Sequence, residues 1–303
     1  MRSPSSPLAS IAGLLVCGAL WGATIPLTKV ATSGGHHPIG LLVWQLVVAS
    51  VLLGALVLRR AIEVPLDATH LRLYAVIAVS GTLLPNSMSL FAYPHLDSAV
   101  MAIVIATVPL LTLLVAALAR TERIDGPRLL GIALGVSALL LIALPEASLP
   151  SRAALPWVAV ALIAPLCYAI ESNVVAARAP PALSPIAMLF AASVLGTALT
   201  VPTAAALGVH VNPFVPWTRV EFALALSALG HVGAYTGYLW LLGRAGAVFS
   251  SQIGYVVTLT AVGIGIVFLD ERPTTMVLLA VPLMLGGIAL VQPRRSLETT
   301  RAA

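Results

Sequence analysis

The sequence predicts an all-α integral membrane protein with ten transmembrane helices, arranged as a 5+5 inverted repeat. Of the 303 residues, 59% are hydrophobic and only 9% are charged, whereas a soluble domain carries about 25% charged residues. A hairpin pattern also occurs twice, in residues 98–143 and 247–292, with two apolar spans around a short polar turn. An offset of 149 positions, which sets Glu122 on Glu271, aligns the copies without a gap. Composition and repeat therefore point to the same architecture.

Apolar spans follow one another along the whole chain after the polar residues 1–7. We place them at about 8–29, 38–58, 71–93, 97–119, 127–144, 154–177, 183–207, 220–243, 246–269 and 274–292. Each has the length that crosses a hydrocarbon core about 30 Å thick. Helices are required because lipid offers backbone polar groups no partners. The first span is long for a signal peptide and more spans follow it, so we interpret it as an uncleaved anchor.

Two repeats and a tail make up the predicted domain organisation. The first repeat covers residues 8–144 with helices one to five, and the second covers 154–292 with helices six to ten. Residues 293–303 form a short polar tail that we expect in the cytoplasm. The connecting loops are about a dozen residues at most, which leaves no room for a soluble domain.

The basic residues predict the orientation, because cytoplasmic loops carry an excess of Lys and Arg. With the N-terminus in the cytoplasm, twelve fall inside and four, Lys29, Arg152, Arg219 and Arg272, fall outside. Both termini are therefore expected in the cytoplasm. Because five spans is an odd number, the two repeats enter the membrane in opposite senses. Such halves can exchange conformations around a site near the midplane, which is the architecture of alternating access.

Several short patterns carry a family resemblance. Leu20-Trp21-Gly22 lies in the first span, Pro109 stands thirteen residues before Glu122, and Gly131 and Ala138 follow in the fifth span. In the second half, Cys167-Tyr168-Ala169 lies in span six and Asp270-Glu271-Arg272 follows span nine. Over about residues 10–292 the chain resembles the EamA-type permeases of the drug/metabolite transporter superfamily. One position departs from the repeat, since Thr258 stands opposite Pro109, so kink symmetry between spans four and nine is not expected.

The resemblance implies a ten-helix secondary transporter of small metabolites such as amino acids or drug-like compounds, often an exporter. It implies that spans one to four and six to nine line a cavity, while spans five and ten lie outside it, sometimes at a dimer contact. The expected partners are therefore a small-molecule substrate, the lipid bilayer and a second copy of the chain. The high Arg and Ala content hints at a bacterial source, and so at the inner (plasma) membrane.

Two ionisable residues within spans are candidates for substrate or proton binding, because such residues are rare and usually face a cavity. Glu171 lies in span six and His231 near the middle of span eight. Glu171 could instead reach the inner interface or pair with Arg178, and His231 could be a neutral imidazole bonded to a neighbouring helix. Histidine titrates near physiological pH, which makes proton coupling a hypothesis.

Aromatic and amide side chains complete the predicted substrate-binding set. His231, Tyr235 and Tyr238 have the i, i+4, i+7 spacing of one helix face, which is more often packing than a ligand site. Asn86 follows Pro85, which loosens the backbone before it. The remaining candidates are Trp21, Gln252 and Tyr255. Amides such as Gln252 could equally be interhelical contacts.

Other classes of function lack their motifs or stay as alternatives. The sequence has no Walker A motif, no Cys/His metal cluster and no clustered basic patch, so we expect no enzyme, cofactor, metal or nucleic-acid partner. Cys17 and Cys167 lie inside apolar spans, as small core residues do. A membrane channel or a lipid-moving protein without coupled transport remains the alternative to a transporter.

Overall fold

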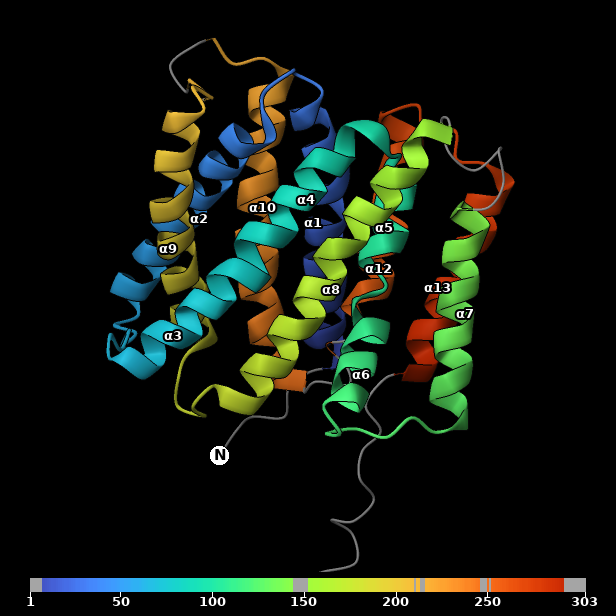
Figure 1. The fold of residues 1–303 in the computed structure, drawn as a ribbon, viewed down its shortest axis with the longest axis horizontal. Helices are drawn as coiled ribbons and strands as arrows, with labels where there is room; N and C mark the ends of the chain where they lie inside the picture. The colour runs from blue at the N-terminus through green and yellow to red at the C-terminus, as the bar shows by residue number, and fades with distance from the viewer. Residues whose placement is uncertain are drawn as a thin grey trace, which may run out of the picture.

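A computed structural model of the chain describes residues 7–143, 152–209, 211–212, 216–245, 250 and 252–291. These residues form helices and no strand, and the helices stand side by side in one bundle (Figure 1). The predicted tail 293–303 lies outside the described residues. A helix lies within each of the ten predicted spans, although the third and fourth spans are each divided into shorter helices and α12 covers only residues 253–268 of the predicted span 246–269, of which residues 246–249 and 251 lie outside the described residues.

The first half contains, in order, α1 (Pro7–Thr32), α2 (Pro38–Arg59), α3 (Ala68–Ile77), the π-helical segment η1 (Ala78–Leu83), α4 (Leu84–Ala92), the 3-10 turn η2 (Tyr93–His95), α5 (Ser98–Ile105), α6 (Val108–Leu118) and α7 (Gly126–Ala143). The second half contains η3 (Arg152–Ala154), α8 (Leu155–Arg178), α9 (Pro185–Ala206), α10 (Arg219–Ala245), α12 (Ile253–Phe268) and α13 (Thr275–Val291). Among the described residues, seven continuous helical segments are long and apolar enough to cross a membrane, and α12 and α13 are shorter apolar helices.

Local sequence signals start several of these helices. The Asp67 side chain accepts hydrogen bonds from the backbone of Thr69 and His70 at the start of α3, and Ser184 accepts one from Ile186 at the start of α9. These side chains satisfy backbone N–H groups that have no partner within the helix. A proline follows Ser184, at the position where a missing N–H costs nothing.

Prolines also explain two irregular spans. Pro85 has no N–H and its ring would meet the carbonyl of residue 81, and the helix before it widens into η1. The fourth span is interrupted at Ala106 and Thr107, just before Pro109 enters α6. In contrast, α12 continues unbroken through Thr258. The kink of span four is therefore not repeated in the described part of span nine.

The helices pack in a pattern that is unchanged when the two halves are exchanged. α1 packs against α10 and α12, and its counterpart α8 packs against α4 and α6. Under the 149-residue offset, α10 corresponds to the third span and α12 to the fourth. α2 packs against its own counterpart α9, and α7 packs against its counterpart α13.

Glycines let α7 and α13 approach closely and in opposite directions. A Cβ atom added at Gly131 would lie 2.8 Å from the carbonyl oxygen of Gly287, and one added at Gly287 would lie 2.7 Å from that of Gly131. Gly131 also faces Val291, whereas Gly287 faces Gly135, so the helices run antiparallel. The turns that precede α7 and α13 therefore lie at opposite ends of the bundle (Figure 1). We call these the Glu122 end and the Glu271 end.

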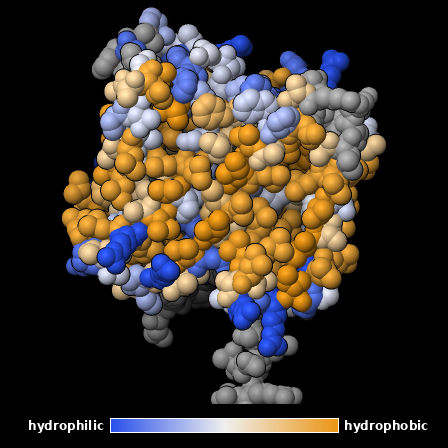
Figure 2. All heavy atoms as spheres, in the orientation of Figure 1, coloured by the Kyte–Doolittle hydropathy of each residue, from blue (hydrophilic) through white to orange (hydrophobic). Residues whose placement is uncertain are grey.

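The outer surface between the two ends is apolar. In Figure 2 hydrophobic residues cover the middle of the visible face, and hydrophilic residues gather above and below them. Large apolar side chains such as Val51, Leu199 and Leu226 are exposed. A water-soluble protein rarely exposes so large an apolar surface, whereas lipid tails would cover it. The chain is therefore a multi-pass membrane protein.

Candidate functional site

An aromatic cluster joins α1 to α10 in the middle of the bundle. Trp21 of α1 meets His231, Tyr235 and Tyr238 of α10 edge to face, with ring centroids 5.7, 6.3 and 6.1 Å apart. The three α10 rings thus share one face, as their spacing indicates. Small residues allow this approach, because a Cβ atom at Gly237 would overlap the sulfur of Cys17.

Glu171 of α8 lies beside the π-helical segment of the third span. A Cβ atom added at Gly81 would overlap the Glu171 carboxylate, so only glycine leaves room for it there. The carboxylate also lies within electrostatic range of Tyr168 and of Tyr235 on α10. Among the described residues it forms no ion pair, and in particular none with Arg178. Glu171 and the aromatic cluster therefore belong to one polar region between α1, η1, α8 and α10.

Two amides in this region make interhelical contacts. Asn86 of α4 accepts a hydrogen bond of 3.1 Å from the hydroxyl of Tyr168. Asn173 donates to the carbonyl of Thr112 on α6 at 3.1 Å and to that of Ala169 in its own helix at 2.9 Å. Asn173 thus links α8 to α6. Asn86 links α4 to α8 through Tyr168, which lies close in sequence to Glu171.

Gln252 and Tyr255 lie at the beginning of α12, and Tyr255 faces away from the aromatic cluster. Ile253 packs with Trp21 and Tyr238, whereas Tyr255 packs against the core cluster that α5, α6 and α13 build. Residues two positions apart point to nearly opposite sides of a helix. The structure therefore brings five of the eight candidates, Trp21, Glu171, His231, Tyr235 and Tyr238, into one region, with Asn86 attached through Tyr168.

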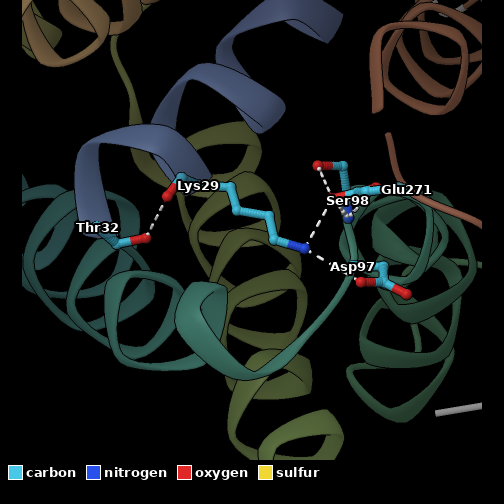
Figure 3. A network of polar contacts seen from close by, with 5 residues as sticks. All are labelled: Lys29, Thr32, Asp97, Ser98 and Glu271. Carbon is cyan, nitrogen blue, oxygen red and sulfur yellow. Dashed lines mark hydrogen bonds and ion pairs between the residues drawn. The ribbon is translucent and has the colours of Figure 1, made fainter. Parts of the chain in front are cut away.

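A charged network at the Glu271 end was not predicted from the sequence (Figure 3). The Lys29 ammonium group, near the end of α1, lies 2.7 Å from a carboxylate oxygen of Glu271 and 3.1 Å from one of Asp97. The Glu271 carboxylate also accepts hydrogen bonds from the backbone N–H of Ser98, at 2.9 and 3.0 Å, and from its hydroxyl at 2.9 Å. It therefore caps the first turn of α5, where the helix dipole favours a negative charge.

The sequence contains one signal for this network, but counting the Lys and Arg residues on each side of the membrane does not reveal it. Lys29 is the single lysine of the chain and stands at the end of a long apolar span. In the sequence analysis Lys29 was counted only as one of the basic residues that predict the orientation in the membrane. Glu271 was noted as part of an acidic turn, but the sequence alone does not show that its side chain reaches α5.

The turns that hold Glu122 and Glu271 share one backbone hydrogen bond. The N–H of Glu122 bonds the carbonyl of Ala116 at 3.4 Å, and the N–H of Glu271 bonds that of Gly265 at 3.1 Å. Both acceptors lie six residues upstream, at matching positions of the repeat. Their side chains differ, since Glu122 pairs with Arg128 at 2.9 Å and is 49% exposed, whereas Glu271 is 7% exposed.

No group of three or more His, Cys, Asp or Glu side chains that could hold a metal occurs in the described part of the chain. The polar region between α1, η1, α8 and α10 contains aromatic rings, amide groups, tyrosine hydroxyls and the carboxylate of Glu171. Such groups can bind an organic molecule and exchange a proton.

Comparisons with known proteins match this architecture. The model of the EamA-like transporter family matches residues 8–144 and again residues 155–292. No curated protein matches the chain. A solved crystal structure of a protein shares the fold with a TM-score of 0.59 and 19% sequence identity, over 95% of this chain and 97% of the other.

Proposed function

Because the chain belongs to the EamA-like transporter family, and so is a membrane transporter of small molecules, we propose that it is a secondary transporter that works by alternating access. Its two repeats would be five-helix modules inserted in opposite senses, and its cargo would be small metabolites such as amino acids or drug-like compounds. We place it in the inner (plasma) membrane as an exporter.

The packing of the two halves is the observation that carries this proposal. α1 packs against α10 and α12 as α8 packs against α4 and α6, and the turns of the two repeats lie at opposite ends of the bundle. Halves related in this way can exchange arrangements, so that one opens the bundle at one end and the other at the opposite end. A simple anchor needs no such relation.

The chemistry of the central region supports an organic substrate with an apolar body and an amine. The ring faces of Trp21, Tyr235 and Tyr238 can contact apolar or cationic groups. The Glu171 carboxylate can pair with an ammonium group, and it has no ion-pair partner among the described residues. Asn86, Gln252 and Tyr255 would supply further hydrogen bonds.

Proton coupling follows as a hypothesis from Glu171 and His231. A carboxylate and an imidazole that can take up protons would let the substrate and protons compete for one region. We therefore expect Glu171→Gln and His231→Ala each to change the pH dependence of transport. If neither variant alters it, the coupling proposal is wrong.

The orientation follows from the basic residues and the ends of the helices. α1 begins and α13 ends at the Glu122 end, because Lys29 and Glu271 mark the other. The Glu122 end carries most of the Arg residues, and we propose that it faces the cytoplasm. Both termini would then be cytoplasmic.

A reconstitution assay tests the function. Purified protein in liposomes would be screened with radiolabelled amino acids, nucleobases and cationic drugs. We expect saturable uptake and counterflow, in which unlabelled internal substrate accelerates entry of the label. Flux that neither saturates nor shows counterflow would indicate a channel, and transfer of fluorescent lipids between leaflets would indicate a lipid-moving protein.

A further inference from the structure

We propose that Arg178 and Glu122 form a second ion pair, the counterpart of Lys29–Glu271, and that the two pairs alternate as latches during transport. The inference rests on the proposed alternating access and adds the groups that hold each end closed.

The repeat sets the four residues opposite one another. The offset of 149 positions places Lys29 on Arg178 and Glu122 on Glu271. Both cations lie at the C-terminal end of the first helix of their half, α1 or α8. Both carboxylates lie in the turn before the last helix of their half, and the backbone N–H of each Glu makes an equivalent hydrogen bond. The same charges therefore occupy equivalent positions at the two ends.

At the Glu271 end the pair is closed. Glu271 bonds Lys29 from α1 and Ser98 from α5, and Asp97 holds the same ammonium group (Figure 3). These contacts tie helices of both halves together. Breaking them would expose a carboxylate that is 7% exposed here.

At the Glu122 end the equivalent pair is open. Glu122 bonds Arg128 of the neighbouring α7, and its side chain is 49% exposed. Arg178 is exposed and takes part in no ion pair among the described residues. The helices that carry them are neighbours, because Asn173 of α8 bonds Thr112 of α6. Movement of α8 towards the turn between α6 and α7 would bring Arg178 to Glu122.

Alternation requires that closing one end opens the other. Each latch stabilises only one conformation, so neutralising it shifts the population towards the opposite one. A side chain with a purely local structural role would not change accessibility at the far end.

Cysteine accessibility in membranes tests this, in a background in which Cys17 and Cys167 are replaced by Ala. Reporters at Ile25→Cys and Val174→Cys are matched by the offset, since each lies four residues before Lys29 or Arg178. We expect Glu271→Gln to raise labelling at position 25 and lower it at 174, each roughly fivefold. Glu122→Gln should do the reverse, and the double variant should return both rates towards the parent.

A second measurement keeps the proposal falsifiable if Glu271→Gln folds poorly. The pair Glu122→Cys and Arg178→Cys should cross-link with a short bifunctional reagent and lower labelling at position 174. Independent labelling at the two ends, or a pair that never cross-links, would overturn the latches. If labelling at positions 25 and 174 changes in opposite directions but no tested compound shows counterflow, the substrate proposal is wrong and the latches stand. If a compound shows saturable counterflow but labelling at the two positions does not change in opposite directions, only the latch proposal is wrong.

Discussion

The two ends of the bundle carry equivalent acidic turns but hold their acidic residues differently. The Glu271 carboxylate bonds Lys29 and the first turn of α5, whereas the Glu122 carboxylate bonds only the nearby Arg128 among the described residues. The two turns share the hydrogen bond made by the Glu N–H, but the left-handed residue is Arg120 in one turn and Asp270, one position later in the repeat, in the other. The groups that surround each carboxylate differ as well. Equivalent sequence positions can therefore report which end of a repeat protein is closed.

The largest expected effect separates the two carboxylates. Glu271→Ala should lower the free energy of unfolding by about 3 kcal/mol, because it leaves Lys29 and the α5 N-terminus without a largely buried partner. Glu122→Ala should cost less than about 1 kcal/mol, as expected for an exposed pair. Denaturation in mixed micelles, followed by tryptophan fluorescence, measures both. Equal losses would show that the ends do not differ energetically.

The next effect tests a contact to which both halves contribute equally. Gly131→Val and Gly287→Val should each cost about 2 kcal/mol, because the added atoms would meet the backbone of the facing helix. The control is Gly263→Ala, whose added Cβ atom has no neighbour within 4 Å and should be nearly neutral. Thermal unfolding in detergent gives the ranking. A large difference between the two valine variants would contradict the symmetric packing of α7 and α13.

A smaller effect is expected away from both ends. Tyr168→Phe removes the hydrogen bond to Asn86 and should cost about 0.6 kcal/mol. Tyr74→Phe is the matched control, because the buried Tyr74 hydroxyl has no hydrogen-bond partner in the described part of the chain. Its removal should be neutral or stabilising. The same unfolding assay applies, and a larger loss in the control would refute this assignment.

The smallest effect compares the backbones of the two turns. Arg120 and Asp270 have positive φ angles of 60° and 52°, in the left-handed region that favours glycine. Arg120→Gly should stabilise the protein by about 0.4 kcal/mol, because the greater freedom of glycine in the unfolded chain offsets part of the relief of the left-handed conformation, and Asp270→Gly by less, since Asp tolerates this conformation better. Chemical denaturation of the two variants tests the order. A loss of stability in Arg120→Gly would show that its side chain matters more than its backbone.

The sequence predicted the spans well because burial in lipid leaves a simple signal. The third span was predicted at 71–93 and the structure extends it to residues 68–95. The spacing of His231, Tyr235 and Tyr238 also predicted their shared face. Periodicity within one helix can be counted from residue types alone.

Periodicity within single helices does not predict contacts between residues that are distant in the sequence. Lys29 and Glu271 are 242 positions apart, and only the packed bundle brings them within 2.7 Å. The π-helical turn at Gly81 was likewise hidden, although Pro85 predicted some loosening of the backbone. The carboxylate of Glu171, on another helix, fills the space that a side chain at position 81 would need, and the sequence does not show this contact.

The glycine contact between α7 and α13 also limits where the molecule can bend. Backbone meets backbone there without intervening side chains, so neither helix can slide past the other without a collision. We expect this pair to behave as a fixed strut. Deformation would then concentrate in the widened turn at residues 78–83 and the break at 106–107, where the helical hydrogen-bond ladder is already interrupted.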